Sequence, residues 1–238
     1  MTIISFEKVT LKYPLLSSYS GAATIASFFF RNKIDPAKTD SIEALSEINL
    51  KLEEGTRLGL LGTNGSGKSS LLRVFKPTTG NVSLKGKIVT IFDLYCGMDE
   101  EANGIENIWI AGLTLGLAGA EIRSKIPDIE YFSNLGDSLR HPVKTYSAGM
   151  KLRLIFSLVS SLQSDILLVD EVIGVGDTKF LKKASERLKK QSSKTKVFVL
   201  ASHSEWALRD FCTTGLVMSS GRIVFHGTIE DAITFYNR

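Results

Sequence analysis

The sequence predicts an α/β layered domain with a mainly parallel sheet, and three observations support this class. The runs "DILLVD" (165–170) and "KVFVLAS" (196–202) are short and almost fully apolar, as in strands buried in the middle of a parallel sheet. Between them, Phe180, Leu181, Ala184 and Leu188 share one face of a helix whose other face is rich in lysine, most simply a solvated surface. The 238 residues, 43% hydrophobic and 23% charged, are enough to bury a core. Strands that alternate with helices therefore indicate α/β layers.

Local patterns predict the elements of the N-terminal half. The segment 3–13, "IISFEKVTLKY", carries β-branched and aromatic residues in rough alternation, which predicts a strand. Residues 14–43 are mixed and contain prolines and serines, so we interpret them as an insertion. Strands are expected at 48–52 and 58–61, and a helix at 68–75 that ends before a proline.

The C-terminal half begins with "NVSLKGKIVTIF" (81–92), which we interpret as a hairpin that turns near its Lys-Gly pair. From about residue 104 to 154 the pattern is helical, with interruptions at glycine and proline. The segment 215–228, "GLVMSSGRIVFHGT", predicts a terminal hairpin with Ser-Gly at its turn.

A phosphate-binding loop is predicted at "GTNGSGKSS" (62–70), which fits the pattern GxxxxGK[ST] directly after a strand and at the start of a helix. Its glycines let successive backbone N–H groups point inward as a nest for phosphate oxygens, and the helix N-terminus adds positive charge. Lys68 is expected to reach the β and γ phosphates, and Ser69 to offer its hydroxyl to Mg²⁺. The alternative is a glycine-rich turn without a ligand. The nucleotide-binding residues predicted here are Gly62, Thr63, Asn64, Gly65, Ser66, Gly67, Lys68, Ser69 and Ser70.

Two adjacent carboxylates end the apolar run "ILLVDE" (166–171). Asp170 is positioned to hold Mg²⁺, and Glu171 to orient or deprotonate an attacking water as general base. In the alternative interpretation the two acids only cap the next turn. His203, which follows the buried strand in "VLASHSEW", is a candidate contact for the γ-phosphate, although a lone histidine is usually structural.

Composition and charge limit the functional classes to be considered. The net charge of +4 is mild; it is compatible with an anionic membrane surface or nucleic acid as partner, but a surplus that keeps the protein in solution is the simpler interpretation. Cys96 and Cys212 form no CxxC or metal spacing, so a reduced cytosolic compartment is the default. The N-terminus lacks the pattern of a secretion signal. The uncharged runs 13–30 and 108–120 are interrupted or shorter than the ~20 residues that span a bilayer, so we expect no crossing of a membrane by this chain alone.

The phosphate loop, "YSAGM" (146–150), "ILLVDE", "GVGD" (174–177) and "ASH" (201–203) occur in one order, which resembles the ATP-binding cassette (ABC) ATPases. In that family the usual signature is Leu-Ser-Gly-Gly-Gln, and "YSAGM" occupies its place. The resemblance covers nearly the whole chain. It implies a P-loop NTPase (RecA-like) core, an N-terminal antiparallel β subdomain and an inserted α-helical subdomain at roughly 95–160, all within one domain, 1–238.

The same resemblance implies a homodimer with two ATP molecules sandwiched between subunits. Ser147 and the backbone N–H of Gly149 start a helix whose positive end would face the γ-phosphate held by the other subunit. Asp177 would lie at the dimer seam, and Tyr13 would stack on adenine. The signature residues expected to contact nucleotide are Ser147, Ala148, Gly149 and Met150.

The replaced signature, "DEVIGVGD" (170–177), "GIENIWIAGLTLGL" (104–117) and the insertion resemble the ABC ATPases that export bacterial cell-surface polysaccharide of the O-antigen, capsule or teichoic acid type. This implies a separate integral-membrane permease, a lipid-linked polysaccharide moved through it, and a peripheral place on the cytoplasmic face of the inner membrane. The chain ends at "TIEDAITFYNR", so no C-terminal carbohydrate-binding domain is expected.

Two features depart from the family pattern. Most cassette ATPases place a glutamine after the strand that matches "KIVTIF", where it contacts Mg²⁺; here the nearest polar candidate is Asp93. The segment between Arg73 and Pro77 is shorter than in similar proteins, which puts the packing of that helix end in question. The alternatives are the ATPase of another exporter and a soluble, non-transport cassette ATPase acting on ribosomes or DNA. One uninterrupted cassette argues against the second.

Overall fold

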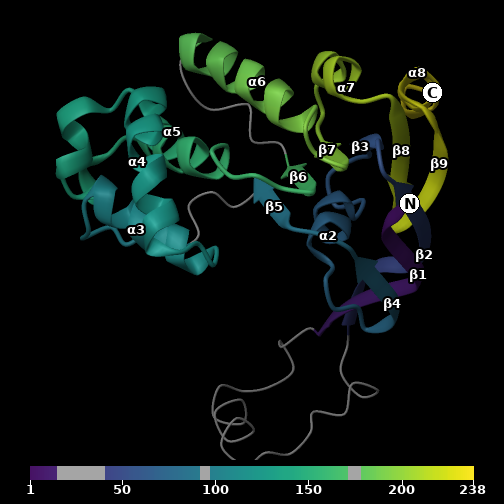
Figure 1. The fold of residues 1–238 in the computed structure, drawn as a ribbon. Helices are drawn as coiled ribbons and strands as arrows, with labels where there is room; N and C mark the ends of the chain where they lie inside the picture. The colour runs from purple at the N-terminus through teal and green to yellow at the C-terminus, as the bar shows by residue number, and fades with distance from the viewer. Residues whose placement is uncertain (15–40, 92–96, 171–177) are drawn as a thin grey trace, which may run out of the picture.

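The computed structural model describes residues 1–14, 41–91, 97–170 and 178–238 (Figure 1). A six-stranded sheet forms the centre of the fold, in the order β5-β6-β7-β3-β8-β9. Neighbouring strands pair in parallel from β5 to β8, and β9 is antiparallel to β8. The strands are β3 (Arg57–Leu61), β5 (Ile88–Ile91), β6 (Ile166–Asp170), β7 (Val197–Ala201), β8 (Thr214–Ser219) and β9 (Arg222–Thr228).

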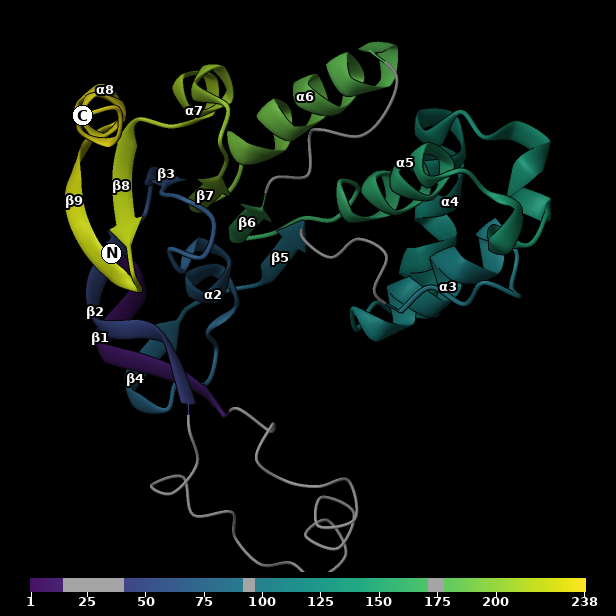
Figure 2. The same cartoon turned by 180° about the vertical axis from the view of Figure 1, so that it is seen from behind.

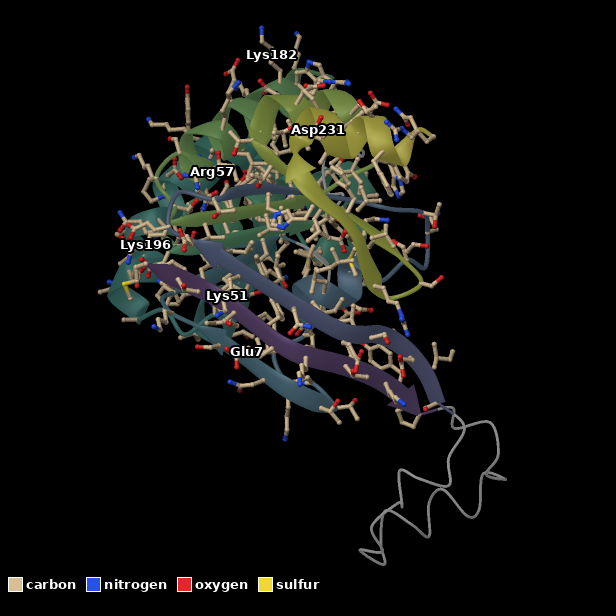
Figure 3. The ribbon with its side chains drawn as sticks, turned by 90° about the vertical axis from the view of Figure 1, so that its right-hand side faces the viewer. Glu7, Lys51, Arg57, Lys182, Lys196 and Asp231 are labelled. Atoms are coloured by element: carbon tan, nitrogen blue, oxygen red, sulfur yellow. The ribbon has the colours of Figure 1, made fainter. Side chains whose placement is uncertain are left out.

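A second, antiparallel sheet has the order β2-β1-β4, formed by β1 (Thr2–Pro14), β2 (Ser41–Glu53) and β4 (Thr79–Leu84). Its outer face is polar: Glu7 on β1 and Lys51 on β2 are exposed there (Figure 3). Its inner face carries apolar side chains such as Leu50 and Leu52, which are buried. This alternation of buried and exposed residues is typical of a sheet with one solvated face.

The helices occupy three places. Beside the β5 edge of the large sheet, α3, α4 and α5 form a helical lobe (Figures 1 and 2). On one face of the sheet lie α6, α7 and α8, whereas α2 lies between the other face and the antiparallel sheet. The bounds are α2 (Lys68–Arg73), α3 (Gly104–Thr114), α4 (Gly119–Ser133), η2 (Gly136–Arg140), η3 (Val143–Thr145), α5 (Ala148–Val159), α6 (Thr178–Ser192), α7 (Glu205–Phe211) and α8 (Ile229–Tyr236).

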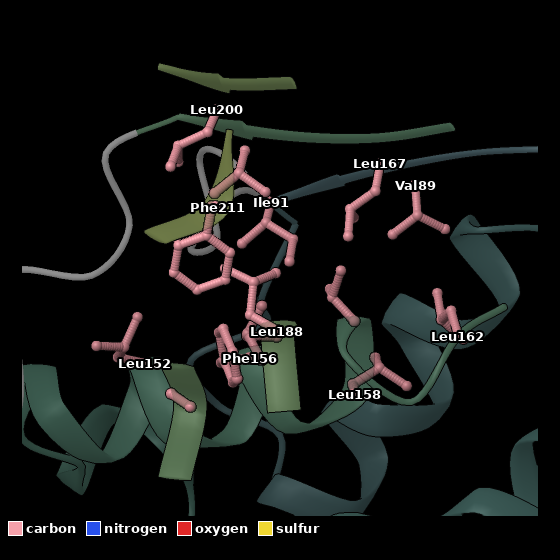
Figure 4. Close-up of a cluster of buried hydrophobic side chains, with 14 of the residues drawn as sticks. Val89, Ile91, Leu152, Phe156, Leu158, Leu162, Leu167, Leu188, Leu200 and Phe211 are labelled. Atoms are coloured by element: carbon pink, nitrogen blue, oxygen red, sulfur yellow. The ribbon is translucent and has the colours of Figure 1, made fainter. Parts of the chain in front are cut away.

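Two hydrophobic cores hold the layers together because successive side chains of a strand point to opposite faces. Along β6, Leu167 belongs to the core under the helices, and Leu168 to the core shared with α2 and the antiparallel sheet. Figure 4 shows part of the first core, where Leu167 and Leu200 of the sheet face Phe156 and Leu158 of α5. Both faces of the central strands are therefore buried, as their apolar sequences predict.

Close packing on the central strand β3 depends on Gly59. A Cβ atom there would lie 2.9 Å from both Leu208 Cδ2 of α7 and Ile229 Cδ1 of α8. A side chain at this position would require the ends of the Leu208 and Ile229 side chains to shift. A glycine at this position therefore lets two helices approach the strand that leads into the phosphate loop.

The predicted fold class is confirmed, and so are the first strand, the two apolar central strands and the terminal hairpin, here β8 and β9. The predicted hairpin at 81–92 is wrong. In the structure Val82 of β4 pairs with Phe6, whereas Val89 of β5 pairs in parallel with Leu167, so the two segments lie in different sheets. A Lys-Gly turn is compatible with both outcomes, because long-range pairing and not the turn decides where each strand goes.

Other boundaries differ from the sequence-based expectation. The second strand begins at Ser41, earlier than expected, because β2 pairs with β1 along nearly its whole length. The helix after the phosphate loop ends at Arg73 rather than near residue 75, with Val74 already outside helical geometry. On α6, Phe180, Ala184 and Leu188 are buried as expected, whereas Leu181 is only partly buried. The division into a core and an inserted helical subdomain at 95–160 stays a prediction, and most of the insertion, 15–40, lies outside the described residues.

Candidate nucleotide-binding site

The loop 62–67 connects β3 to α2 at the carboxyl edge of the parallel sheet. Gly62, Gly65 and Gly67 have φ angles of 149°, 79° and 104°, which favour glycine. A Cβ on Gly62 would lie 2.5 Å from the backbone oxygen of Met218, so the turn is also held by the β8 strand beside it. The local conformation thus requires the glycines that the sequence motif places there.

Lys68 lies inside this loop. Its side chain is buried, and Nζ donates to the backbone oxygens of Gly62 at 2.6 Å and of Thr63 at 3.1 Å. The loop carbonyls therefore hold a full positive charge at its centre. Ser66 Oγ is also buried and has no hydrogen-bond partner among the described residues. Both features suit a loop that surrounds phosphate oxygens.

Asp170 ends β6 next to the helix that follows the loop. Its side chain is 13% exposed, and Oδ2 lies 3.9 Å from Nη2 of Arg73 in the last turn of α2. Ser69, in the first turn of the same helix, is exposed. Asp170 therefore lies against the last turn of α2, and Ser69 lies in its first turn; that the two bind one Mg²⁺ stays a prediction. The contact made by Arg73 was not anticipated, because no local pattern connects residues so far apart in sequence.

His203 follows β7, the next strand of the sheet. Its Nε2 atom lies 3.1 Å from Oδ1 of Asn64, so the ring N–H donates to the amide oxygen of a phosphate-loop residue. His203 is exposed. The histidine that the sequence placed after a buried strand thus contacts the phosphate loop through Asn64. Its catalytic role stays a prediction.

The signature segment starts α5, as predicted. Ser147 is the N-cap, and its Oγ accepts from the backbone N–H of Met150 at 3.2 Å. A Cβ on Gly149 would meet only Ser147 Oγ, at 3.9 Å, so the surface at this helix start is open. Tyr146, just before it, is buried and donates its hydroxyl to the Ser138 oxygen at 2.5 Å; burial raises the pKa of this phenol.

The phosphate loop and the signature segment, which are the two halves of the predicted site, lie in different parts of the single chain. The phosphate loop precedes α2 below the sheet, whereas Ser147 starts α5 in the helical lobe (Figure 1). Tyr13, near the end of β1, is 49% exposed and pairs with Ile42 of β2. Asp93, Glu171 and Asp177 lie outside the described residues, so their predicted roles stay predictions.

The segment before the signature is anchored by charge, which the sequence-based analysis missed. Lys144 Nζ lies 2.6 Å from Glu101 Oε2, and Lys151 Nζ lies 2.6 Å from Glu100 Oε1. The hydrogen bond from Lys151 lowers the pKa of Glu100. These pairs connect residues 100–101, which precede α3, to both sides of Ser147. Because the paired residues lie more than 40 positions apart in the sequence, no local pattern indicates that they form ion pairs.

A parallel sheet, a glycine-rich loop around a buried lysine after β3 and a carboxylate at the tip of β6, two strands away in the sheet, define a P-loop nucleotide-binding fold. The sequence model of the ABC transporter family matches residues 45–174. The chain belongs to the ABC transporter family and is one of its ATPases.

Three curated proteins similar to this chain are ATP-binding proteins of export systems. The chain is 36% identical to the O-antigen export system ATP-binding protein RfbE of Yersinia enterocolitica, over 94% of this chain and 97% of that protein. It is 34% identical to the O-antigen export system ATP-binding protein RfbB of Myxococcus xanthus, over 92% and 50%. It is also 34% identical to the teichoic acids export ATP-binding protein TagH of Bacillus anthracis, over 98% and 42%. The chain thus spans nearly all of the first relative and half or less of the other two.

Solved structures share the fold. The dimeric post-hydrolysis state of the ATP-binding cassette MJ0796 bound to ADP and Pi matches with a TM-score of 0.73 and 20% identity, over 95% of this chain and 99% of that one. The ATP-binding subunit of an ABC transporter matches with a TM-score of 0.74 and 19% identity, over 99% and 94%. In the part of the chain that the structure describes, no helix combines the length and apolar character needed to cross a membrane.

Proposed function

We propose that this ABC ATPase drives the export of a lipid-linked cell-surface polysaccharide through a separate membrane permease. The observation that carries the proposal is the match to RfbE, an O-antigen export ATP-binding protein, over 97% of that protein's length. The teichoic acid exporter TagH is a further relative from a polysaccharide pathway. O-antigen, capsule and teichoic acid remain the candidate cargo classes.

In this proposal Mg²⁺ is bound with ATP. The residues fit the ion because Asp170 offers a shielded carboxylate and Ser69 a hydroxyl, and Mg²⁺ prefers oxygen ligands. When bound, Mg²⁺ neutralises charge on the phosphate oxygens. Lys68, already held inside the loop, binds and orients the phosphates. Asp93 is proposed as a further ligand on sequence grounds alone.

Hydrolysis is assigned to residues at the strand ends. Glu171, next to Asp170 in the sequence, takes the proton of the attacking water. His203 contacts the γ-phosphate and helps to orient it. The hydrogen bond between His203 and Asn64 supports this role, because it holds the ring against the phosphate loop. Tyr13 stacks on adenine, for which its exposed position at the end of β1 is suitable.

We further propose that two copies of the chain complete each site. The support is the separation of the phosphate loop from the capped, open helix start at Ser147 within one chain, together with the fold shared with a dimeric cassette. Ser147 to Met150 of one copy would then face the nucleotide of the other. Asp177 would lie at the seam.

The permease would hold this protein on the cytoplasmic face of the inner membrane, and no nucleic-acid partner is expected. The test is deletion of the gene in its native bacterium, followed by complementation with the wild type or with Glu171→Gln. Only the wild type should restore surface polysaccharide, measured by gel analysis of cell-envelope extracts. Unchanged polysaccharide after deletion would favour the alternative, the ATPase of another exporter.

A further inference from the structure

A cleft of about 1000 Å³ lies between α4, α6 and the connection from α5 to β6. Lys87 and Asp165, which directly precede β5 and β6, form part of its wall. Because β5 and β6 are parallel, the cleft lies at the amino edge of the sheet. The phosphate loop and Asp170 lie at the carboxyl edge, so the cleft is separate from the nucleotide site.

A row of cations from α6 faces this cleft. Lys183, Arg187 and Lys190 of α6 line it, at spacings of four and three residues that keep one helical face in register, and Lys194, two residues past the end of the helix, lines it as well. With Lys87, five cations line the cleft against three carboxylates, those of Asp128, Asp165 and Glu186.

Two of the three carboxylates form ion pairs, and one of these pairs uses a cation of the cleft, Arg187. Asp128 pairs with Arg187, and Asp165 with Lys196, which lies outside the cleft lining. Lys87, Lys183, Lys190 and Lys194 make no ion pair with the residues that the structure describes. The cleft is therefore positively charged, which favours an anionic occupant.

The cleft also offers hydrogen-bonding groups and an aromatic surface. Ser160, Ser161 and Ser164 line it; the first two already donate their hydroxyl hydrogens to the backbone oxygens of Ser157 at 3.3 Å and Leu158 at 2.7 Å, so their hydroxyl oxygens are left to accept. Two buried polar atoms of lining residues, Ser164 Oγ and Gln191 Oε1, have no partner within the described part of the chain. The Gln191 amide is oriented by its Nε2, which donates to the Leu162 oxygen at 2.8 Å, so its oxygen is left to accept. Tyr131, 81% exposed, lies on the lining as well.

We propose that this cleft is a second ligand site, which binds a sugar phosphate independently of ATP. Lysine ammonium groups bind phosphate as point charges. The Ser164 hydroxyl can exchange hydrogen bonds with sugar hydroxyls, and the Gln191 amide oxygen can accept from them. An exposed tyrosine ring covers the less polar face of a sugar. The inference uses only the residues of the cleft and does not depend on the proposed transport function.

The test is calorimetric titration of the full chain with glucose 1-phosphate, while a non-hydrolysable ATP analogue and Mg²⁺ saturate the nucleotide site. Glucose and inorganic phosphate are titrated separately as partial probes. The variant carries Lys183→Glu and Lys190→Glu. The matched control carries Lys179→Glu and Lys182→Glu, the same charge change on exposed positions of α6 that do not line the cleft; Figure 3 shows Lys182 projecting from the surface.

We expect saturable binding of glucose 1-phosphate that is tighter than binding of either partial probe. The cleft variant should bind at least ~10-fold more weakly, since it reverses two cations near the phosphate, and the control should match the wild type. The milder pair Lys183→Gln and Lys190→Gln repeats the measurement with less perturbation, and circular dichroism checks the fold of every variant.

Four outcomes would overturn the proposal. They are absence of binding, equal weakening in the control variant, loss of binding when Lys68 is replaced by alanine, and inorganic phosphate binding as tightly as the sugar phosphate. The second would mean general charge attraction, the third would mean binding in the phosphate loop, and the fourth would mean that the sugar is not recognised.

Discussion

Lys151 Nζ lies 2.6 Å from Glu100 Oε1, which ties the first turns of α5 to the segment that precedes α3. Ser147 caps that same helix, so the ion pair fixes the signature to residues that directly follow the strand β5 and its connection. The lysine side chain is only 21% exposed, whereas that of Glu100 is 64% exposed. The pair is therefore a positioning contact at the signature rather than a large source of stability.

We predict that Glu100→Lys and Lys151→Glu each lower ATPase activity by roughly two- to fivefold, because a like-charge contact replaces an attraction of modest energy. The double variant restores the pair in reverse and should recover most of the activity. Steady-state hydrolysis at low and high salt measures this. Equal activity of the singles and the double would show that the pair does not position the signature.

Lys68→Ala should abolish nucleotide binding, because the charge held by the oxygens of Gly62 and Thr63 is lost from the loop. Titration with a fluorescent ATP analogue is the measurement. Lys76→Ala, which removes an exposed cation shortly after α2, is the matched control and should bind normally. Tight ATP binding by the Lys68 variant would refute the assignment of the loop.

Glu171→Gln should slow hydrolysis by ~10²–10⁴-fold, the usual contribution of a general base, and leave ATP binding intact. Because ATP then persists, the variant should accumulate as a dimer with ATP and Mg²⁺, which light scattering after size-exclusion chromatography detects. Ser147→Arg in the same background, which places a bulky cation at the helix start, should stay monomeric. A Glu171→Gln protein that remained monomeric would contradict the two-chain site.

Cys212 should be chemically inert in the folded protein. Burial raises the pKa of its thiol to about 12, so near pH 8 almost no thiolate, the reactive form, is present. In a Cys96→Ser background, iodoacetamide at pH 8 should modify the chain only after denaturation, as mass spectrometry would show. Rapid modification of the native protein would indicate that the core around Cys212 opens readily.

Much of the nucleotide site could be predicted because its conformation is local. Positive φ angles at Gly62, Gly65 and Gly67 follow from the loop sequence itself, and the helix starts at Lys68 where the motif ends. The start of α5 was equally predictable, since Ser147 caps it through a bond to Met150 three residues on. Such interactions need no information from distant parts of the chain.

The hairpin predicted at 81–92 is wrong because local sequence signals do not determine long-range strand pairing. Val82 and Val89 are seven residues apart, yet one pairs with Phe6 and the other with Leu167. A local turn signal cannot select between a neighbouring strand and one far along the chain. The choice depends on which apolar faces can be buried together.

The sequence by itself determined the class of fold, the phosphate loop, the acid at the tip of β6 and the helix start at the signature, because short-range sterics and hydrogen bonds specify each of them. Only the tertiary structure decided that β4 and β5 enter different sheets, that His203 contacts Asn64, and that Lys183 and Lys190 of α6 line a cleft. Those relationships arise when strands and helices distant in the chain pack to bury apolar surface, and that burial depends on the whole chain at once.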